Sequence, residues 1–257
     1  MTIKILKVIA LNTFKEAVRD RILYLLLFFA AVSILFARVL ALLTVGDRAK
    51  IIKDVGLASI SLFGALMAIL IGTGLVYKEI EKRTIFTIIS KPIRRPEFLL
   101  GKFFGLVLTL FVMLLAMSLI FLALVFVHTW TIEWTMLAAI FFIFLELVLI
   151  TAVAVLFSCF STPILSSLFA LSFYLIGHFS WSLETFIKKA RPGATKVLLQ
   201  VLYAVLPDLE NLNLKTEVVH GLPLSAAHLL YSAAYGIVYA AFILALAVLI
   251  FRRRDFV

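Results

Sequence analysis

Cysteine and charged residues are both scarce in this chain of 257 residues. Cys159 is the only cysteine, which excludes an internal disulfide and a metal cluster held by cysteines. Only 15% of the residues are charged, whereas 64% are hydrophobic. One soluble core cannot hide that much apolar surface, so the composition excludes an ordinary soluble protein. It predicts an all-α integral membrane protein in which residues 1–257 form a single transmembrane domain.

Motifs for catalysis and for metal binding are missing as well. Gly101-Lys102 has the last glycine and lysine of a phosphate-binding Walker A loop. Pro96 stands in place of the first glycine, and Phe103 in place of the Ser or Thr, so the loop is absent. An intramembrane hydrolase would depend on HFSWS at 178–182 alone, without a GxSxG or HExxH motif. The four histidines match no metal-ligand spacing, so we expect no catalytic residue, cofactor or metal in this chain.

Long apolar runs separated by short polar turns predict six transmembrane helices. Before them, residues 1–20 predict an amphipathic interface helix, because apolar residues recur there every three or four positions. The polar stretch 46–54 is expected to form the first turn, and 184–225 an extracytoplasmic segment. Within that segment, 197–206 is too short to cross a bilayer and predicts a short helix on the outer leaflet. The expected spans are about 22–44, 55–77, 98–127, 135–160, 163–183 and 226–251.

The lysines and arginines indicate which side of the membrane each segment occupies. Six spans place both termini on one side, together with the segment between spans two and three. Fifteen Lys and Arg residues lie in these parts, against eight in the segments on the other side. Because positive charge concentrates on the cytoplasmic side of membrane proteins, we expect both termini to be cytoplasmic.

The segment between spans two and three is unusually charged, with ten charged residues at 78–102, seven of them positive. Its first part, 79–90, predicts a short cytoplasmic helix with apolar side chains on its surface. Pro92 ends that helix, because a proline disfavours helical geometry in the residue before it. Pro96 suits the first turn of the next helix, and Glu97 complements the positive end of its dipole. Charge alone is also typical of an ordinary cytoplasmic loop.

The order of residues in this segment resembles the cytoplasmic signature of the ABC-2 family of ABC transporter permeases. The matching residues are Glu81-Lys82-Arg83-Thr84, then Ser90-Lys91-Pro92-Ile93, Arg95, Glu97-Phe98-Leu99-Leu100 and Gly101-Lys102. Arg83 stands where many members of the family have glycine, a departure that bears on local geometry and partner choice. The resemblance extends less specifically over the whole chain, from the amphipathic start to the terminal Arg-Arg-Asp-Phe.

This resemblance implies a coupling helix at 79–90 that, beside the helix at 1–20, sits on an ATPase. It implies two cytoplasmic ABC ATPase subunits, which bind ATP and magnesium, and a second permease subunit, identical or a similar paralogue. We expect a multi-pass protein of a prokaryotic inner membrane, in contact with lipids and without a nucleic-acid partner. The expected cargo is an exported lipid-like or amphipathic molecule. Residues assigned to ATPase coupling are Glu79, Glu81, Arg83, Phe86, Ile89 and Arg95, of which Arg95 alternatively binds lipid phosphates.

Glu146 is the only charged residue in the expected span 135–160. An ionisable residue inside a membrane is costly, and it is a candidate for a transport pathway or a proton site. The alternatives are that Glu146 is protonated or paired with a hydroxyl such as that of Ser118 or Ser172. If Glu146 carries protons, the chain is a proton-coupled secondary transporter, although such transporters are commonly built from inverted repeats that this sequence does not show.

Overall fold

The computed structural model is a bundle of helices, as expected for an all-α protein. It describes residues 2–44, 46–81, 94–131, 133–180 and 207–253 and five isolated positions between 186 and 200; at 75–81 only the backbone is described. No strand occurs among these residues. The helices are α1 (Thr2–Val18), α2 (Arg21–Leu43), α3 (Arg48–Glu81), α5 (Arg95–Thr129), α6 (Trp134–Ser158), α7 (Pro163–His178), the 3-10 turn η1 (Leu209–Leu212), α10 (Lys215–His220) and α11 (Ala226–Arg253).

Five of these helices, α2, α3, α5, α6 and α11, are long and apolar enough to cross a membrane. The chain is therefore a multi-pass membrane protein. The expected count of six transmembrane helices is not confirmed, because α7 has only 16 residues. A helix of that length rises about 24 Å, less than the roughly 30 Å of a hydrocarbon core. Helix α7 ends five residues before the end of the expected fifth span, 163–183.

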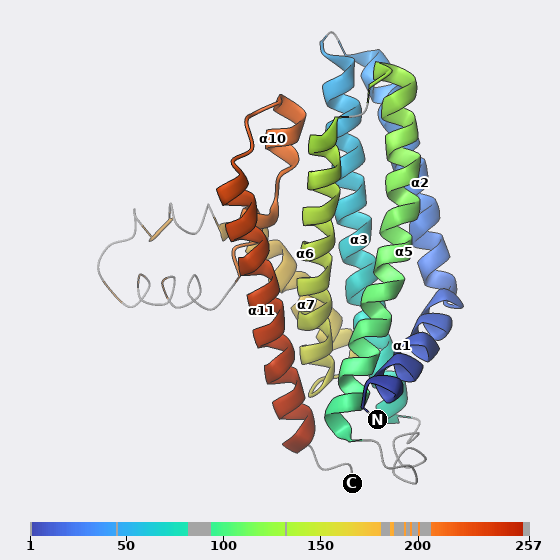
Figure 1. Cartoon of the computed structure of the whole chain (residues 1–257), viewed down its shortest axis with the longest axis vertical. Coiled ribbons are helices and arrows are strands. Elements are labelled where there is room, and N and C mark those ends of the chain that lie inside the picture. Colours follow the sequence, from blue (N-terminus) through green and yellow to red (C-terminus); the bar gives the residue numbers. More distant parts are fainter. Residues whose placement is uncertain are drawn as a thin grey trace.

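The two ends of the bundle differ in what they carry (Figure 1). We call one end of the bundle the terminal end. Helices α1 and α5 begin there, and α3 and α11 end there. The far end carries the α2–α3 turn, the α5–α6 turn and α10. Since α6 ends at the terminal end and α11 starts towards the far end, the chain must return between them. This return is divided: α7 covers its first part, and residues 207–225, with η1 and α10, cover its last part.

Side-chain caps explain where two of the long helices begin. Asp47 accepts a hydrogen bond from the backbone N–H of Ala49 at 3.1 Å, so α3 starts at Arg48, inside the expected turn 46–54. At the terminal end, the backbone N–H of Arg94 donates to Glu97 Oε2 at 3.2 Å, and a proline occupies the first turn of α5. The roles expected for Pro96 and Glu97 at the start of this helix are thus confirmed.

Helix α3 forms the centre of the bundle and packs on α2, α5, α6, α7 and α10. Two-thirds (67%) of its most apolar stretch is buried, as in α6, whereas α2 has 22% of such a stretch buried and faces outwards. Glycines allow the close approach of α3 and α6. A Cβ placed on Gly64 would lie 2.8 Å from Leu147 Cδ1, and one on Gly72 would lie 2.9 Å from the Cβ of Ala154.

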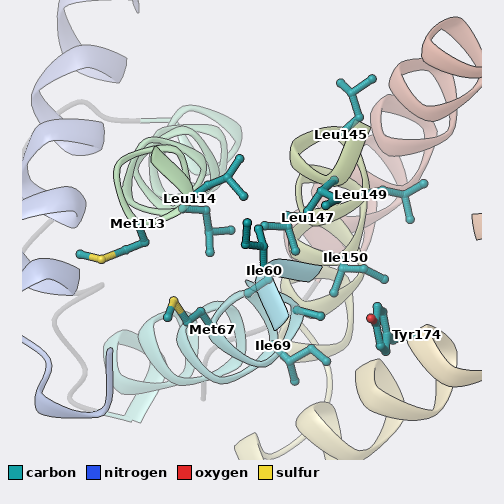
Figure 2. Close-up of a cluster of buried hydrophobic side chains, with 14 of the residues drawn as sticks. Ile60, Met67, Ile69, Met113, Leu114, Leu145, Leu147, Leu149, Ile150 and Tyr174 are labelled. Atoms are coloured by element: carbon teal, nitrogen blue, oxygen red, sulfur yellow. The ribbon is translucent and has the colours of Figure 1, made fainter. Parts of the chain in front are cut away.

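Interlocking aliphatic side chains fill the space around these contacts (Figure 2). Met67 of α3 and Met113 of α5 lie on neighbouring helices, and Leu147 of α6 extends towards Ile60 of α3. All four are buried. The interior of the described residues is therefore packed by side chains, and α3 is held from several sides at once.

Replacement of Gly72 by Ala is expected to lower the free energy of unfolding by about 1–3 kcal/mol, because Ala154 cannot rotate away from the added methyl group. Gly74 offers a matched control two residues along the same helix, since a Cβ there would meet nothing within 4 Å. Thermal unfolding of Gly72→Ala and Gly74→Ala in detergent tests this difference. Equal midpoints for the two variants would show that α3 and α6 are not in close contact at Gly72.

Candidate functional site

Glu146 lies midway along α6 and is completely buried. Its Oε1 is 2.8 Å from Nε2 of His178, at the end of α7. Its partner is thus a histidine and not one of the expected hydroxyls: Ser118 Oγ has no hydrogen-bond partner among the described residues, and Ser172 is exposed. A charge inside a membrane protein is tolerated where a partner of opposite charge meets it, and His178 provides one in its protonated form.

His178 reaches Glu146 because the end of α7 lies beside the middle of α6. The ring therefore lies inside the bundle. The other ring nitrogen, Nδ1, is 3.7 Å from Glu210 Oε2 on η1. The ring also packs edge-on against Tyr174, one turn earlier in α7, with ring centroids 4.7 Å apart. One imidazole therefore stands between two carboxylates.

Glu210 belongs to η1, and its carboxylate faces the imidazole of His178 across the 3.7 Å contact. The amide of Asn213 donates to Glu210 Oε1 at 3.0 Å, so the carboxylate is also held from within its own segment.

Lys215, the first residue of α10, makes a second connection into the bundle. Its Nζ donates to Ser61 Oγ on α3 at 2.9 Å, and Ser61 lies 3.4 Å from the hydroxyl of Tyr174. These contacts join α3, α6, α7, η1 and α10 at one level of the bundle. We call the group the inner polar cluster; its members are Ser61, Glu146, Tyr174, His178, Glu210 and Lys215.

The chain entering η1 is held by a separate set of hydrogen bonds around Asp208. Its carboxylate accepts hydrogen bonds from Ser180, just after α7, and from the amide of Asn211. Its backbone N–H donates to the hydroxyl of Tyr235 on α11 at 2.9 Å. The residues next to Asp208 are thereby fixed between α7 and α11.

Three of the residues assigned to ATPase coupling lie at the terminal end of the bundle. Glu79 and Glu81 lie in the last turn of α3. Arg83, Phe86 and Ile89 lie outside the described residues. The guanidinium of Arg95, at the start of α5, donates to the backbone carbonyl of Arg252 at 3.2 Å. Arg95 thus satisfies a carbonyl at the end of α11, where the helix itself has no donor to offer.

Helix α1 lies across the beginning of α5, at the same end of the bundle (Figure 1). Gly101 and Gly105 of α5 make this contact. A Cβ on Gly105 would lie 2.6 Å from both the carbonyl oxygen of Ala10 and Thr13 Cβ. Lys102, between the two glycines, is buried and pairs with Glu16 of α1 at 3.3 Å. Helices α1, α5 and α11 are therefore linked at the terminal end of the bundle.

A family model described as "ABC-2 family transporter protein" matches residues 7–256. The chain belongs to the ABC-2 transporter family. This ABC-2 protein is accordingly a membrane-spanning permease subunit of an ABC transporter, a class that is generally non-catalytic and works with an ATPase partner. No match to it was found among curated proteins. Among the described residues of this permease, no three His, Cys, Asp or Glu side chains are grouped as metal ligands.

Sequence reasoning identified Glu146 of this permease but missed the rest of the inner polar cluster. Tyr174 and His178 are one turn apart at the end of an apolar helix, and this polar ending was the available signal that the helix stops early. Glu210 and Lys215 belong to a stretch, 207–215, whose polar composition suggested a loop outside the membrane. Their contacts with α3 and α7 are tertiary and leave no periodic pattern.

A double-mutant cycle on Glu146 and His178 is expected to be strongly non-additive. Glu146→Leu or His178→Leu alone leaves one buried polar group without its partner, a change that costs about 3–5 kcal/mol in a protein interior. The double variant removes both groups and should lose much less stability than the sum of the two. Denaturation in detergent measures all four proteins. Additive losses would show that the 2.8 Å contact contributes nothing to the folded state.

Proposed function

We propose that the chain is the permease subunit of a dimeric ATP-driven exporter, moved by two cytoplasmic ATPase subunits that bind residues 79–90. The observation that carries this proposal is the continuity of α3. It runs without a break for 34 residues, from Arg48 to Glu81, directly into the segment with the family signature. A helix of this length is a rod of roughly 50 Å.

The packing of α3 supports a mechanical role. Because α2, α5, α6, α7 and α10 all contact this helix, a force on its Glu81 end acts on every one of them. Packed helices respond to such a force by shifting as rigid bodies, since their interfaces are not continuously deformable. The neighbouring end of α5 is tied to α11 through Arg95, and Phe98 stacks on Phe251 with centroids 6.3 Å apart. Movement at the ATPase contact would therefore reach the whole subunit.

The filled interior supports a transport path between two permease subunits. Side chains pack the space among α3, α5 and α6 in the described residues, and Glu146 is completely buried. Large apolar side chains remain exposed on α2, for example Phe28 at 61% and Leu35 at 55%. An apolar path of this kind suits lipid-like or amphipathic cargo, with a second permease subunit, identical or paralogous, forming its other wall. Proton-driven transport through Glu146 draws no support from the family match.

ATP and magnesium are expected on the ATPase, and the permease is expected in a prokaryotic inner membrane with both termini in the cytoplasm. The bundle is consistent with this orientation, since α1, the end of α3 and the end of α11 share one end of it. The cytoplasmic ATPase then faces the terminal end. In this orientation the α2–α3 turn and α10 face the opposite compartment.

Co-purification with the ATPase encoded beside this chain tests the coupling role of 79–90. Phe86→Asp should reduce the retained ATPase by about tenfold or more, because an apolar anchor at an interface commonly contributes over 2 kcal/mol. Glu81→Lys is expected to release the ATPase or to uncouple its ATP hydrolysis from the permease. Phe86→Leu and Lys50→Glu, a charge reversal in the exposed first turn of α3 at the far end, serve as controls.

Retention of the ATPase by all four variants would place the contact elsewhere in the chain. If the unaltered protein retains no ATPase, the proposed coupling fails as a whole. Membrane insertion of each variant is checked first, so that loss of the ATPase is not confused with loss of the permease.

The orientation is tested with single cysteines in a Cys159→Ala background. An impermeant maleimide added to the outside of intact cells should label Asp47→Cys at the far end and leave Lys4→Cys at the terminal end unlabelled. Both positions are exposed, so accessibility depends on the side of the membrane alone. The reverse pattern would place the termini outside and remove the proposed ATPase site from the cytoplasm.

A further inference from the structure

Residues 207–215 lie inside the bundle although much of this segment is not α-helical. Leu209 and Leu212 are completely buried, and Leu214 nearly so. Irregular backbone at membrane depth is tolerated only where protein covers it, and here α6, α7 and α11 do so. The segment thus fills the part of the return crossing that α7 leaves open.

Two glycines form the surfaces on which leucines of this segment pack, and we call these surfaces its glycine seats. Leu209 rests on Gly177 of α7, where an added Cβ would lie 2.7 Å from two of its atoms. Leu212 rests on Gly236 of α11, where the corresponding distance is 3.1 Å. The glycines let these leucines approach closely, and polar contacts hold the segment in addition to this packing.

Those polar contacts form a charge-balanced bridge. His178 joins Glu146 through Nε2 and Glu210 through Nδ1, at 2.8 and 3.7 Å. The imidazole attracts both carboxylates electrostatically only when it carries a positive charge, so the bridge is strongest with protonated His178. Lys215 adds a second positive charge, bound to Ser61. Two carboxylates and two cations thus face one another inside the bundle.

The groups that face His178 come from every element packed around it. They are Glu146 on α6, Tyr174 on α7, Glu210 on η1 and Lys215 on α10, while α3 contributes only the uncharged hydroxyl of Ser61. Glu146 Oε2 is buried and has no hydrogen-bond partner among the described residues. The bridge is therefore incompletely satisfied, and buried ion pairs of this kind favour one arrangement without adding much stability over apolar packing.

We propose that the inner polar cluster is a proton-dependent latch, in which protonated His178 holds residues 207–215 against α3, α6 and α7. When the bridge breaks, the segment leaves its glycine seats, and the subunit adopts a second arrangement that is open towards the far end. Gly221, with a φ of +66°, follows α10 and is a position that can absorb the change in direction. The latch does not depend on the proposed ATPase contact and is tested without it.

The test measures how fast a thiol in the segment reacts. Leu212→Cys, in a Cys159→Ala background, places a reporter at a completely buried position of the segment. The purified full chain in detergent is treated with a maleimide, and each rate is divided by that of an exposed cysteine at Asp47 measured at the same pH. His178→Gln and Glu146→Gln should each raise the normalised rate by about tenfold or more, because labelling follows the population of the open arrangement. Raising the pH should do the same when His178 is present and should have no effect in His178→Gln.

Two controls separate a latch from general loosening. Glu133→Gln breaks a 2.7 Å ion pair with Lys53 at the far end and should leave the reporter protected. A second reporter, Met117→Cys in the buried face of α5, should stay unreactive in every variant. If His178→Gln also exposes this second reporter, the variant has unfolded. The proposal is then decided by comparing the normalised rates at acid and alkaline pH in the protein that retains His178.

The proposal is overturned if the normalised rate at Leu212→Cys is the same at acid and alkaline pH while His178 is present. It is equally overturned if His178→Gln and Glu146→Gln remain folded and leave the reporter as protected as before. A rise with Glu133→Gln equal to that with Glu146→Gln would also overturn it, since any lost ion pair would then have the same effect.

Discussion

The bilayer offers no water to a buried polar group, and this constraint governs the whole molecule. Each backbone N–H and C=O must be satisfied within the chain, and helices do so without help from neighbours. Charged side chains obey the same rule by meeting in pairs, as Glu146 does with His178 inside the bundle and Lys102 with Glu16 at its terminal end. Where a helix stops inside the bundle, other parts of the chain must cover its end. Residues 207–215 do this for α7.

The close approach of α3 to its neighbours follows from a different requirement. Lipid tails are as apolar as leucine, so helices in a membrane gain little by hiding apolar surface from each other. Their contacts depend on shape, and glycines at Gly64 and Gly72 give α3 a surface that Leu147 and Ala154 can approach. The same device recurs between α5 and α1, and between α11 and Leu212. A central helix that touches so many others cannot move independently of them.

Hydropathy predicted the all-helical fold and the positions of five spanning helices, because each long apolar run predicts a helix without reference to the rest of the chain. The start of α5 was predictable too, since Pro96 and Glu97 are local signals. The start of α3 was not, because Asp47 caps the helix within a stretch that looks like a turn. Nor was the length of α7, which ends at a histidine whose partners lie 32 residues away in either direction. Contacts of that kind are set by how helices pack, and no periodic pattern in the sequence records them.

Helix α1 lies against α5, and this contact dictates an order of assembly. During synthesis α1 emerges first, but the surface formed by Gly101 and Gly105 does not exist until α2 and α3 have been made and α5 has followed them. Until then, Glu16 has no Lys102 to pair with, and the apolar side of α1 has only the lipid surface to rest on. Helix α1 therefore reaches its final place only after α5 has been made.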